Sequence, residues 1–358
     1  MIKSILLSIL TFYSVALIAQ MKPMYVGTYT NNGSKGIYVY DFNQATGVAR
    51  LKNTISMSNP SFIARDENFL YAVNEDVEGT ITAVDLRNGA ILNSLPTNGA
   101  HPCHVSLSPT IPVAVVSNYS SGSLVLYSIN KDGSLNKQED FIAFKNSGLN
   151  KSRQASSHIH SAFFSKDGQF LFVSDLGGDI IYKMNITKNN DGYKLNIVDE
   201  INVKAGGGPR HVVFNDKGTL LYAVLELTGE IEVLAFNKGK WNSKQIVPMY
   251  TAGFNGEHGG GDIKMTADAK FIYATNRGQA NEIAVYAVKK DGLLKPLQII
   301  SVEGNSPRNV QLSPDEKWVI VSNQLTNGLT YFKRDTKTGQ LTSVNRKESI
   351  PSSVCTIF

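Results

Sequence analysis

A short apolar pattern recurs seven times along the chain, and this repeat constrains the fold more than any other feature. Each copy is an apolar run that leads to a fixed position, as in "LYAVNE", "LFVSDL" and "VIVSNQ". The spacing between copies is roughly 44 to 57 residues, which is typical of propeller repeats. The aligned positions are Thr28, Asn74, Asn118, Asp175, Leu225, Asn276 and Asn323.

The segments around each copy complete a unit of four short strands. A turn precedes most copies, as in "SKDGQF" and "NDKGTL", and Asp, Gly and Asn are the residues that close hairpins. Other strand patterns occur before the turn ("PRHVVFN"), after the aligned position ("EIEVLAF") and after turns such as "KDGSL". Such a unit buries its apolar faces only against neighbouring units, and no 3.6-residue helical pattern competes. We therefore predict an all-β fold, a seven-bladed β-propeller of four-stranded antiparallel blades.

The two ends of the propeller indicate how its ring closes. The first copy, "MYVGTYT", lacks the preceding strand that the later copies have. The C-terminal segment "PSSVCTIF" has that strand pattern but no continuation. We expect residues Val354 to Phe358 to form the innermost strand of the first blade.

The N-terminal segment is typical of a signal peptide. Lys3 precedes a mostly apolar run from Ile5 to Ile18, and Ala19 is a small residue suited to cleavage. We expect a signal peptide at residues 1–20 and a single seven-bladed β-propeller domain at 21–358, exported to the periplasm or secreted. The apolar run is too short for a comfortable membrane span, and no other stretch approaches the required length, so no membrane association is expected after cleavage.

Charge and cysteine content limit the expected partners. The net charge of +5 arises from 35 Lys and Arg against 30 Asp and Glu, without a basic run, so nucleic-acid binding is not expected. Cys103 and Cys355 are far apart in the sequence and form no framework of spacings, so two buried thiols are predicted. The protein is expected to be a monomer.

Two columns of the repeat should meet at one face of the propeller. The first strand of a blade starts where the antiparallel second strand ends. At the start of the first strand, repeats three to seven have Cys103, His160, Arg210, Gly261 and Arg308, followed by His104, Ser161, His211, Asp262 and Asn309. After the aligned position come Tyr29, Glu75, Tyr119, Leu176, Glu226, Arg277 and Gln324. A concave channel mouth with convergent polar groups suits a ligand, although any single residue could be polar only because the channel is wet.

Four residues of consecutive repeats are the catalytic candidates: His160, Arg210, Glu226 and Arg277. Guanidinium groups bind carboxylate or phosphate, and they stabilise the oxyanion formed when water attacks an ester. A His or Glu can activate that water. This set favours hydrolysis or rearrangement of a small acidic ester. Substrate-binding roles are predicted for His158, His104, His211, Asp262, Asn276, Asn309, Gln324 and Tyr119.

Other kinds of site are less well supported by the sequence. No "GxSxG" elbow is present, so the serines near His160 are expected to form loop hydrogen bonds. No known metal-ligand spacing accompanies His158 and His160, so no metal site is predicted. His158 is expected to be a rim residue. The glycines of "GGGPRH" and "GEHGGGD" are expected to permit tight connections and close backbone approach.

Several motifs give the chain a family resemblance: "RQxxxHxHS" from Arg153, "GPRH" from Gly208, "LEL" from Leu225, "TNRG" from Thr275 and "SPRN" from Ser306. Through them the chain resembles the seven-bladed β-propeller lactonases, which include bacterial 6-phosphogluconolactonases and fungal carboxy-muconate lactonizing enzymes. The resemblance covers nearly the whole chain from Tyr25 onward.

The resemblance implies a lactonase whose substrate is a small anionic lactone: it would hydrolyse a sugar-acid lactone, most like 6-phosphogluconolactone to 6-phosphogluconate. It implies no cofactor. By motif, the family's proposed catalytic residues fall on His160, Glu226, Arg210 and Arg277. The two arginines would hold the anionic group or the oxyanion, and Glu226 or His160 would activate water. A carboxy-muconate-type cycloisomerase and a non-enzymatic ligand-binding propeller remain alternatives. Asp262 replaces a more usual glutamate and Leu225 a more usual asparagine, which bears on the pocket shape and the substrate.

Overall fold

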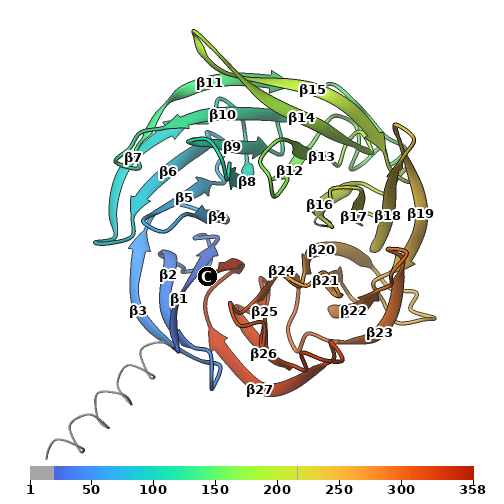
Figure 1. The fold of residues 1–358 in the computed structure, drawn as a ribbon. Coiled ribbons are helices and arrows are strands. Elements are labelled where there is room, and N and C mark those ends of the chain that lie inside the picture. The colour runs from blue at the N-terminus through green and yellow to red at the C-terminus, as the bar shows by residue number, and fades with distance from the viewer. Residues whose placement is uncertain (1–19, 216) are drawn as a thin grey trace, which may run out of the picture.

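Seven antiparallel sheets stand around a central axis in the computed structural model (Figure 1). The structure describes residues 20–215 and 217–358, and within these ranges the regular elements are all strands. Each sheet has four strands and forms one blade. The predicted seven-bladed propeller is therefore confirmed. The predicted signal peptide lies outside the described residues except for Gln20.

The strands have the following bounds, given from the innermost to the outermost strand of each blade. Blade 1 contains β28 (Ser353–Ile357), β1 (Met21–Thr28), β2 (Gly36–Asn43) and β3 (Val48–Ser56); blade 2 contains β4 (Phe62–Arg65), β5 (Phe69–Asn74), β6 (Thr80–Asp85) and β7 (Ala90–Pro96). Blade 3 contains β8 (Pro102–Leu107), β9 (Val113–Asn118), β10 (Ser123–Ile129) and β11 (Leu135–Ala143); blade 4 contains β12 (Ile159–Phe164), β13 (Leu171–Asp175), β14 (Ile180–Asn189) and β15 (Gly192–Asn202). Blade 5 contains β16 (Pro209–Phe214), β17 (Leu220–Leu225), β18 (Glu230–Asn237) and β19 (Lys240–Pro248). Blade 6 contains β20 (His258–Met265), β21 (Phe271–Gly278), β22 (Glu282–Val288) and β23 (Leu294–Ser301); blade 7 contains β24 (Pro307–Leu312), β25 (Trp318–Asn323), β26 (Gly328–Arg334) and β27 (Leu341–Ser349).

The C-terminal strand closes the ring as predicted. β28 pairs antiparallel with β1, with Gly27 opposite Cys355, and it is the innermost strand of blade 1. The backbone N–H of Thr356 donates to Asn309 Oδ1 in blade 7 at 2.8 Å. The C-terminus therefore lies close to the axis (Figure 1) and joins the last blade to the first.

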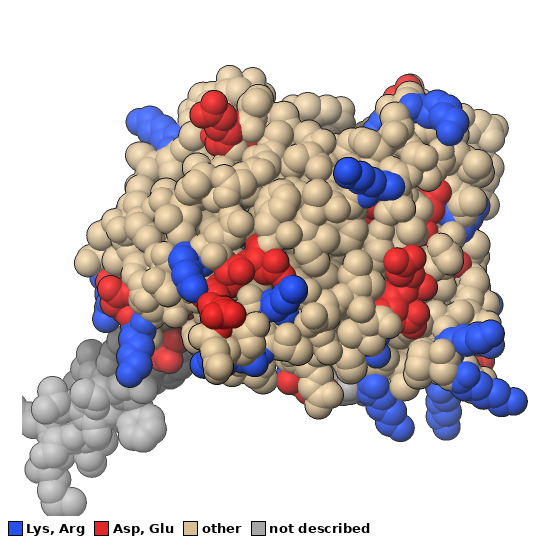
Figure 2. Space-filling view, turned by 90° about the horizontal axis from the view of Figure 1, so that it is seen from above, with Lys and Arg blue, Asp and Glu red and all other residues tan. Residues whose placement is uncertain are grey.

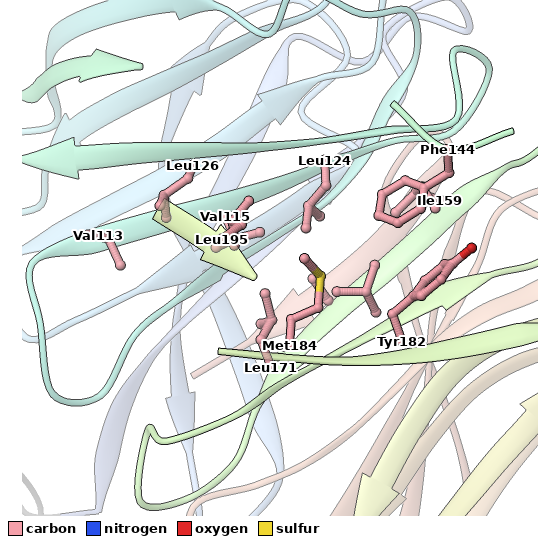
Figure 3. Packing of buried hydrophobic residues seen from close by; sticks show 12 residues of the cluster. Val113, Val115, Leu124, Leu126, Phe144, Ile159, Leu171, Tyr182, Met184 and Leu195 are labelled. Carbon is pink, nitrogen blue, oxygen red and sulfur yellow. The ribbon is translucent and has the colours of Figure 1, made fainter. Parts of the chain in front are cut away.

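The core of the molecule is a set of apolar clusters between neighbouring blades. Such clusters fill all seven interfaces of the described ring, each formed by the facing residues of two adjacent sheets. Figure 3 shows the interface between blades 3 and 4, where Val115 and Leu124 pack against Ile159 and Met184. Because both faces of each blade are buried in this way, the strands carry near-continuous apolar runs.

Tyrosines of the second strand also connect one blade to the next. Each donates its hydroxyl to the carbonyl of a glycine in a turn of the following blade, and these glycines have positive φ values between 77° and 85°. The hydrogen bonds are Tyr71 to Gly133 at 2.8 Å, Tyr222 to Gly292 at 2.9 Å and Tyr273 to Gly339 at 2.7 Å.

The polar residue at the aligned position has a structural role. Asp175 accepts hydrogen bonds from the backbone N–H of His158 at 2.9 Å and of Gly177 at 3.0 Å. Asn276 likewise accepts from the N–H of Gly259 at 2.8 Å. These side chains fix the chain where it enters the innermost strand, and so they position the residues that follow.

The surface and the cysteines agree with the sequence analysis. Cys103 and Cys355 are both buried free thiols, as predicted. In the space-filling view, Lys, Arg, Asp and Glu are scattered among mostly uncharged residues (Figure 2). Within the described ranges, no helix has the length and hydropathy to cross a bilayer.

Candidate active site

A cavity of about 590 Å³ opens at the face where the second strands end and the innermost strands begin. Six of the seven blades contribute to it, so the two sequence columns converge as predicted. From the columns, its lining includes Glu75, Cys103, Tyr119, His160, Glu226, Arg277 and Arg308, and from other segments Asn150, Arg153, Leu227, His258, Gly259, Gly278, Asn305, Ser306 and Leu325.

A β-bulge lies at the start of the innermost strand in blades 3 to 7. In blade 4, Ile159 pairs with Asp175 and Ser161 pairs with Ser174, so His160 is the extra residue between them. The ladders of the other four blades shift register at the same place. A bulge leaves one residue unpaired and redirects its side chain. The extra residues in this column therefore turn toward the channel mouth rather than following the regular alternation of the strand.

Glu226 is the centre of the charged cluster in this cavity. Its Oε2 atom accepts a hydrogen bond from Arg210 Nε at 3.1 Å and forms an ion pair with Arg277 Nη2 at 2.7 Å, and its Oε1 atom accepts a hydrogen bond from Arg153 Nη2 at 2.6 Å. Burial opposes the charged form, but Arg277, His160, Arg210 and Arg153 together hold the pKa of Glu226 well below its usual 4.5. Glu226 is therefore a carboxylate throughout the physiological pH range.

Glycine carbonyls hold the guanidinium groups of Arg210 and Arg277 against Glu226. Arg210 Nη1 donates to Gly261 O at 2.5 Å, and Arg277 donates to Gly260 O from Nε at 3.2 Å and Nη2 at 2.9 Å. A Cβ atom on Gly261 would lie 2.5 Å from Pro307 O, so only glycine fits there. Burial, with repulsion from Arg277 and Arg308, lowers the pKa of Arg210 to about 10, which still leaves it charged at neutral pH.

His160 lies beside this cluster as a neutral imidazole. Its Nε2 atom is 3.7 Å from Glu226 Oε2, and its Nδ1 atom is 3.9 Å from the sulfur of Cys103. Burial and the nearby Arg210 charge hold the pKa of His160 well below 6.5. Burial raises the pKa of Cys103, so its thiol stays protonated. The site thus holds a buried imidazole that can accept a proton at neutral pH.

Four of the predicted binding residues form a buried layer that does not line the cavity. His211 Nδ1 lies 2.7 Å from Asp262 Oδ1, and its Nε2 atom is 3.4 Å from Arg210 Nη1. Asp262 also accepts a hydrogen bond from Asn309 Nδ2 at 2.5 Å. His104 lies between Phe62 and Phe163, with ring centroids 4.2 and 4.6 Å away. All four are almost fully buried, and of the four only His211 contacts the Arg210 side chain.

The protonation of this layer follows from its hydrogen bonds. Burial and the Arg210 charge lower the pKa of His211 to about 4. Arg210 can only donate, so His211 Nε2 accepts and Nδ1–H donates to the Asp262 carboxylate. The pKa of Asp262 is lowered despite its burial, because Lys264 and His211 face it. Asp262 therefore sets the tautomer of His211, and His211 orients Arg210.

Of the other predicted binding residues, only Tyr119 lines the cavity. Its hydroxyl accepts a hydrogen bond from Arg153 Nη2 at 3.1 Å. His158 stacks on the Tyr119 ring with centroids 4.5 Å apart, and it lies outside the cavity lining. Asn276 is buried against Gly259, and Gln324 contributes a backbone hydrogen bond to Ser306, so neither reaches the cavity.

Among the acidic, basic and imidazole side chains of the cavity, four were not selected from the sequence: Glu75, Arg153, His258 and Arg308. Glu75 and Arg308 belong to the two columns, and that position was the available signal. Arg153 precedes β12 in an irregular segment, where the adjacent Gln154 donates to Leu176 O at 2.9 Å and to Asp179 Oδ1 at 2.7 Å. The "RQ" pair of the family motif marked this segment without indicating that Arg153 contacts Glu226.

The charged side chains that line the cavity are mainly cationic. In the described part of the chain, no three His, Cys, Asp or Glu side chains are grouped so that they could hold a metal ion. Guanidinium groups, the imidazoles of His160 and His258, and two carboxylates are the groups available for chemistry here. Such a set can bind an anion, transfer a proton and stabilise an oxyanion.

Comparison with known proteins gives consistent matches over nearly the whole chain. A family model described as "Lactonase, 7-bladed beta-propeller" matches residues 23–358. The 6-phosphogluconolactonase of Formosa agariphila is 33% identical over 332 residues, which cover 89% of this chain and 94% of that protein. The 6-phosphogluconolactonase of Bacillus subtilis is 32% identical over 345 residues, covering 93% and 97% of the two chains. The solved periplasmic gluconolactonase of Pseudomonas aeruginosa is 30% identical with a TM-score of 0.85, covering 94% and 98%.

Proposed function

Because this chain belongs to the seven-bladed β-propeller lactonase family, as its motifs indicated, we propose that it opens a sugar-acid lactone carrying an anionic group, most like 6-phosphogluconolactone. The family and its named relatives make the chain a lactone-hydrolysing carboxylic-ester hydrolase. Only the identity of the lactone goes beyond that statement.

The charge of the cavity carries the proposed substrate class. Arg153, Arg277 and Arg308 line it together with two carboxylates, Glu75 and Glu226, which leaves an excess of positive charge. Arg210 adds a further cation in direct contact with Glu226, and His160 is neutral. A mouth of this charge attracts an anionic substrate and disfavours a cationic one.

In the proposed reaction, His160 is the base and Arg277 stabilises the oxyanion. His160 takes a proton from water as the water oxygen attacks the lactone carbonyl carbon. Arg277 is bound through Nε and Nη2, and no described residue accepts a hydrogen bond from its Nη1, which therefore remains to stabilise the carbonyl oxygen. When the ring C–O bond breaks, the leaving oxygen takes the proton from His160. Glu226 stabilises the imidazolium in between, since its charge raises the pKa of His160.

The assignment of the base to His160 narrows the choice left open by the sequence. Glu226 forms ion pairs with three arginines, and its pKa is well below 4.5. A carboxylate so stabilised is a poor proton acceptor. We propose that Glu226 orders the cluster and stabilises charge while His160 transfers the proton.

A lactone panel tests this function. The purified protein should open 6-phosphogluconolactone faster than spontaneous hydrolysis, and a muconate-type diacid assayed beside it should not cyclise. Diacid cyclisation without lactone opening would favour a cycloisomerase. Specific thermal stabilisation by sugar acids with neither reaction would favour a ligand-binding propeller.

We also propose that the protein is exported and acts as a monomer without nucleic-acid or membrane partners. The apolar N-terminal segment supports export, and a relative of 30% identity is named as periplasmic. Fractionation of the producing cells and N-terminal sequencing of the mature protein would check this proposal. A start near residue 20 in the periplasmic or secreted fraction is expected.

A further inference from the structure

Arg308 differs from the other arginines of the cavity in its lack of a partner. Arg153, Arg210 and Arg277 each contact the Glu226 carboxylate. Arg308 lies at the bulge that begins β24 and lines the same cavity. Among the described residues, none forms a hydrogen bond or ion pair with its guanidinium group.

The surroundings of Arg308 hold this group in place without neutralising it. Its guanidinium carbon lies 5.4 Å from the centre of the Tyr29 ring, a cation–π arrangement. The Tyr29 hydroxyl donates to Glu75 Oε2 at 2.8 Å, and burial raises the pKa of Tyr29, so the phenol stays protonated. Glu75 lies near Arg308 but forms no ion pair with it, and its Oε2 atom is already used by Tyr29. The five N–H donors of Arg308 thus remain available to a ligand in the cavity.

We propose that Arg308 binds the anionic group of the substrate, a phosphate or carboxylate remote from the lactone carbonyl, and so determines which lactones are preferred. This inference rests on the proposed lactonase function. It moves the anion-binding role away from Arg210 and Arg277, which the sequence suggested for it, because Glu226 already balances those charges. A planar guanidinium group with free donors binds either anion in a bidentate manner.

The test compares three lactones with the full-length protein and three variants. The lactones are 6-phosphogluconolactone, a glucarolactone with a free carboxylate, and neutral glucono-δ-lactone. Arg308→Gln should lower kcat/KM for the preferred anionic lactone by about 10- to 100-fold more than for the neutral one, mainly through KM. For Arg308→Lys, kcat/KM on the anionic lactone should lie between the wild-type and Arg308→Gln values. Lysine keeps the positive charge but cannot bind an anion through two parallel N–H donors. Arg50→Gln, an exposed change on the outermost strand β3, should alter none of the values.

The outcomes separate this inference from the proposed function. If Arg308→Gln changes kcat/KM equally for all three lactones, or does not change it, the inference is overturned. The anionic lactone whose kcat/KM falls more shows whether Arg308 binds phosphate or carboxylate. If the wild type opens no lactone, the lactonase function fails. Calorimetric binding of 6-phosphogluconate and gluconate then still tests Arg308, since the wild type should prefer the phosphorylated acid and Arg308→Gln should lose that preference. Equal melting temperatures of the wild type and the variants would exclude misfolding. If Arg308→Gln does not fold, the same kinetic comparison is made with Arg308→Lys.

Discussion

Arg277 and Glu226 meet at 2.7 Å although they are 51 residues apart, because they occupy the same position in two consecutive repeats. Glu226 follows β17 of blade 5, and Arg277 lies near the end of β21 of blade 6. The repeat thus places a carboxylate and a guanidinium group at equivalent points of adjacent blades.

Replacing Arg277 should impair the chemical step. Arg277→Ala removes the Nη1 donor that is available to the oxyanion, so kcat should fall by roughly 10²- to 10³-fold. Steady-state kinetics on the best lactone measure this loss. Arg50→Ala, an exposed change on β3, is the control and should leave kcat unchanged. A loss confined to KM would contradict the oxyanion role.

The pH profile should report the neutral state of His160. The reaction requires the unprotonated imidazole, and burial holds its pKa below 6.5, so kcat/KM should stay level at neutral pH and decline only below pH 6.5. The enzymatic rate is measured after subtraction of spontaneous hydrolysis at each pH. His160→Gln should lower kcat by about 10²- to 10⁴-fold and abolish this acid limb. An acid limb centred at or above pH 7, or one retained in the variant, would exclude His160 as the base.

Asp262 should act on activity through His211 and Arg210. Asp262→Asn removes the charge that sets the His211 tautomer, so kcat should fall about tenfold or more while KM stays within about threefold. The buried partners left unsatisfied should lower the free energy of unfolding by about 1–3 kcal/mol.

The control for Asp262 is Asp268→Asn, which changes a carboxylate on an exposed turn paired with Lys270. It should alter stability by less than about 0.5 kcal/mol and leave kcat intact. If Asp262→Asn lowers stability but keeps kcat, its role is structural only. Asp262→Glu should recover part of the kcat, since it restores the carboxylate.

Removal of the C-terminal strand should open the ring. A chain that lacks Pro351 to Phe358 loses β28 and exposes the inner edge of β1. It should show no cooperative thermal transition, and a synthetic peptide of the missing residues should restore one. An unchanged melting temperature of the truncated protein would contradict closure by β28.

The repeat predicted much of the fold because propeller blades share one apolar pattern. Blade number, strand order and closure by the C-terminal strand followed from aligning the copies. The same alignment brought His160, Arg210, Glu226 and Arg277 together, because equivalent positions of neighbouring blades lie at one face.

The sequence pattern did not predict which of these side chains reach the cavity and which lie buried beneath it. The bulges at the start of the innermost strands send His160 and Arg308 toward the cavity, and they leave His211 and Asp262 buried below it. A bulge depends on backbone pairing across strands, which an alternating pattern does not report. Asn276 shows a second limit, since an amide that holds the backbone has the same sequence pattern as one that binds a ligand.

The most direct test of the account is the lactonase activity of Glu226→Gln. The change keeps the shape of the side chain but removes the charge that holds three arginines and stabilises protonated His160. Once circular dichroism and melting temperature show that the variant is folded, kcat for opening of the best lactone should fall by at least about 100-fold. A folded variant that opens lactones within a few-fold of the wild-type rate would contradict the account.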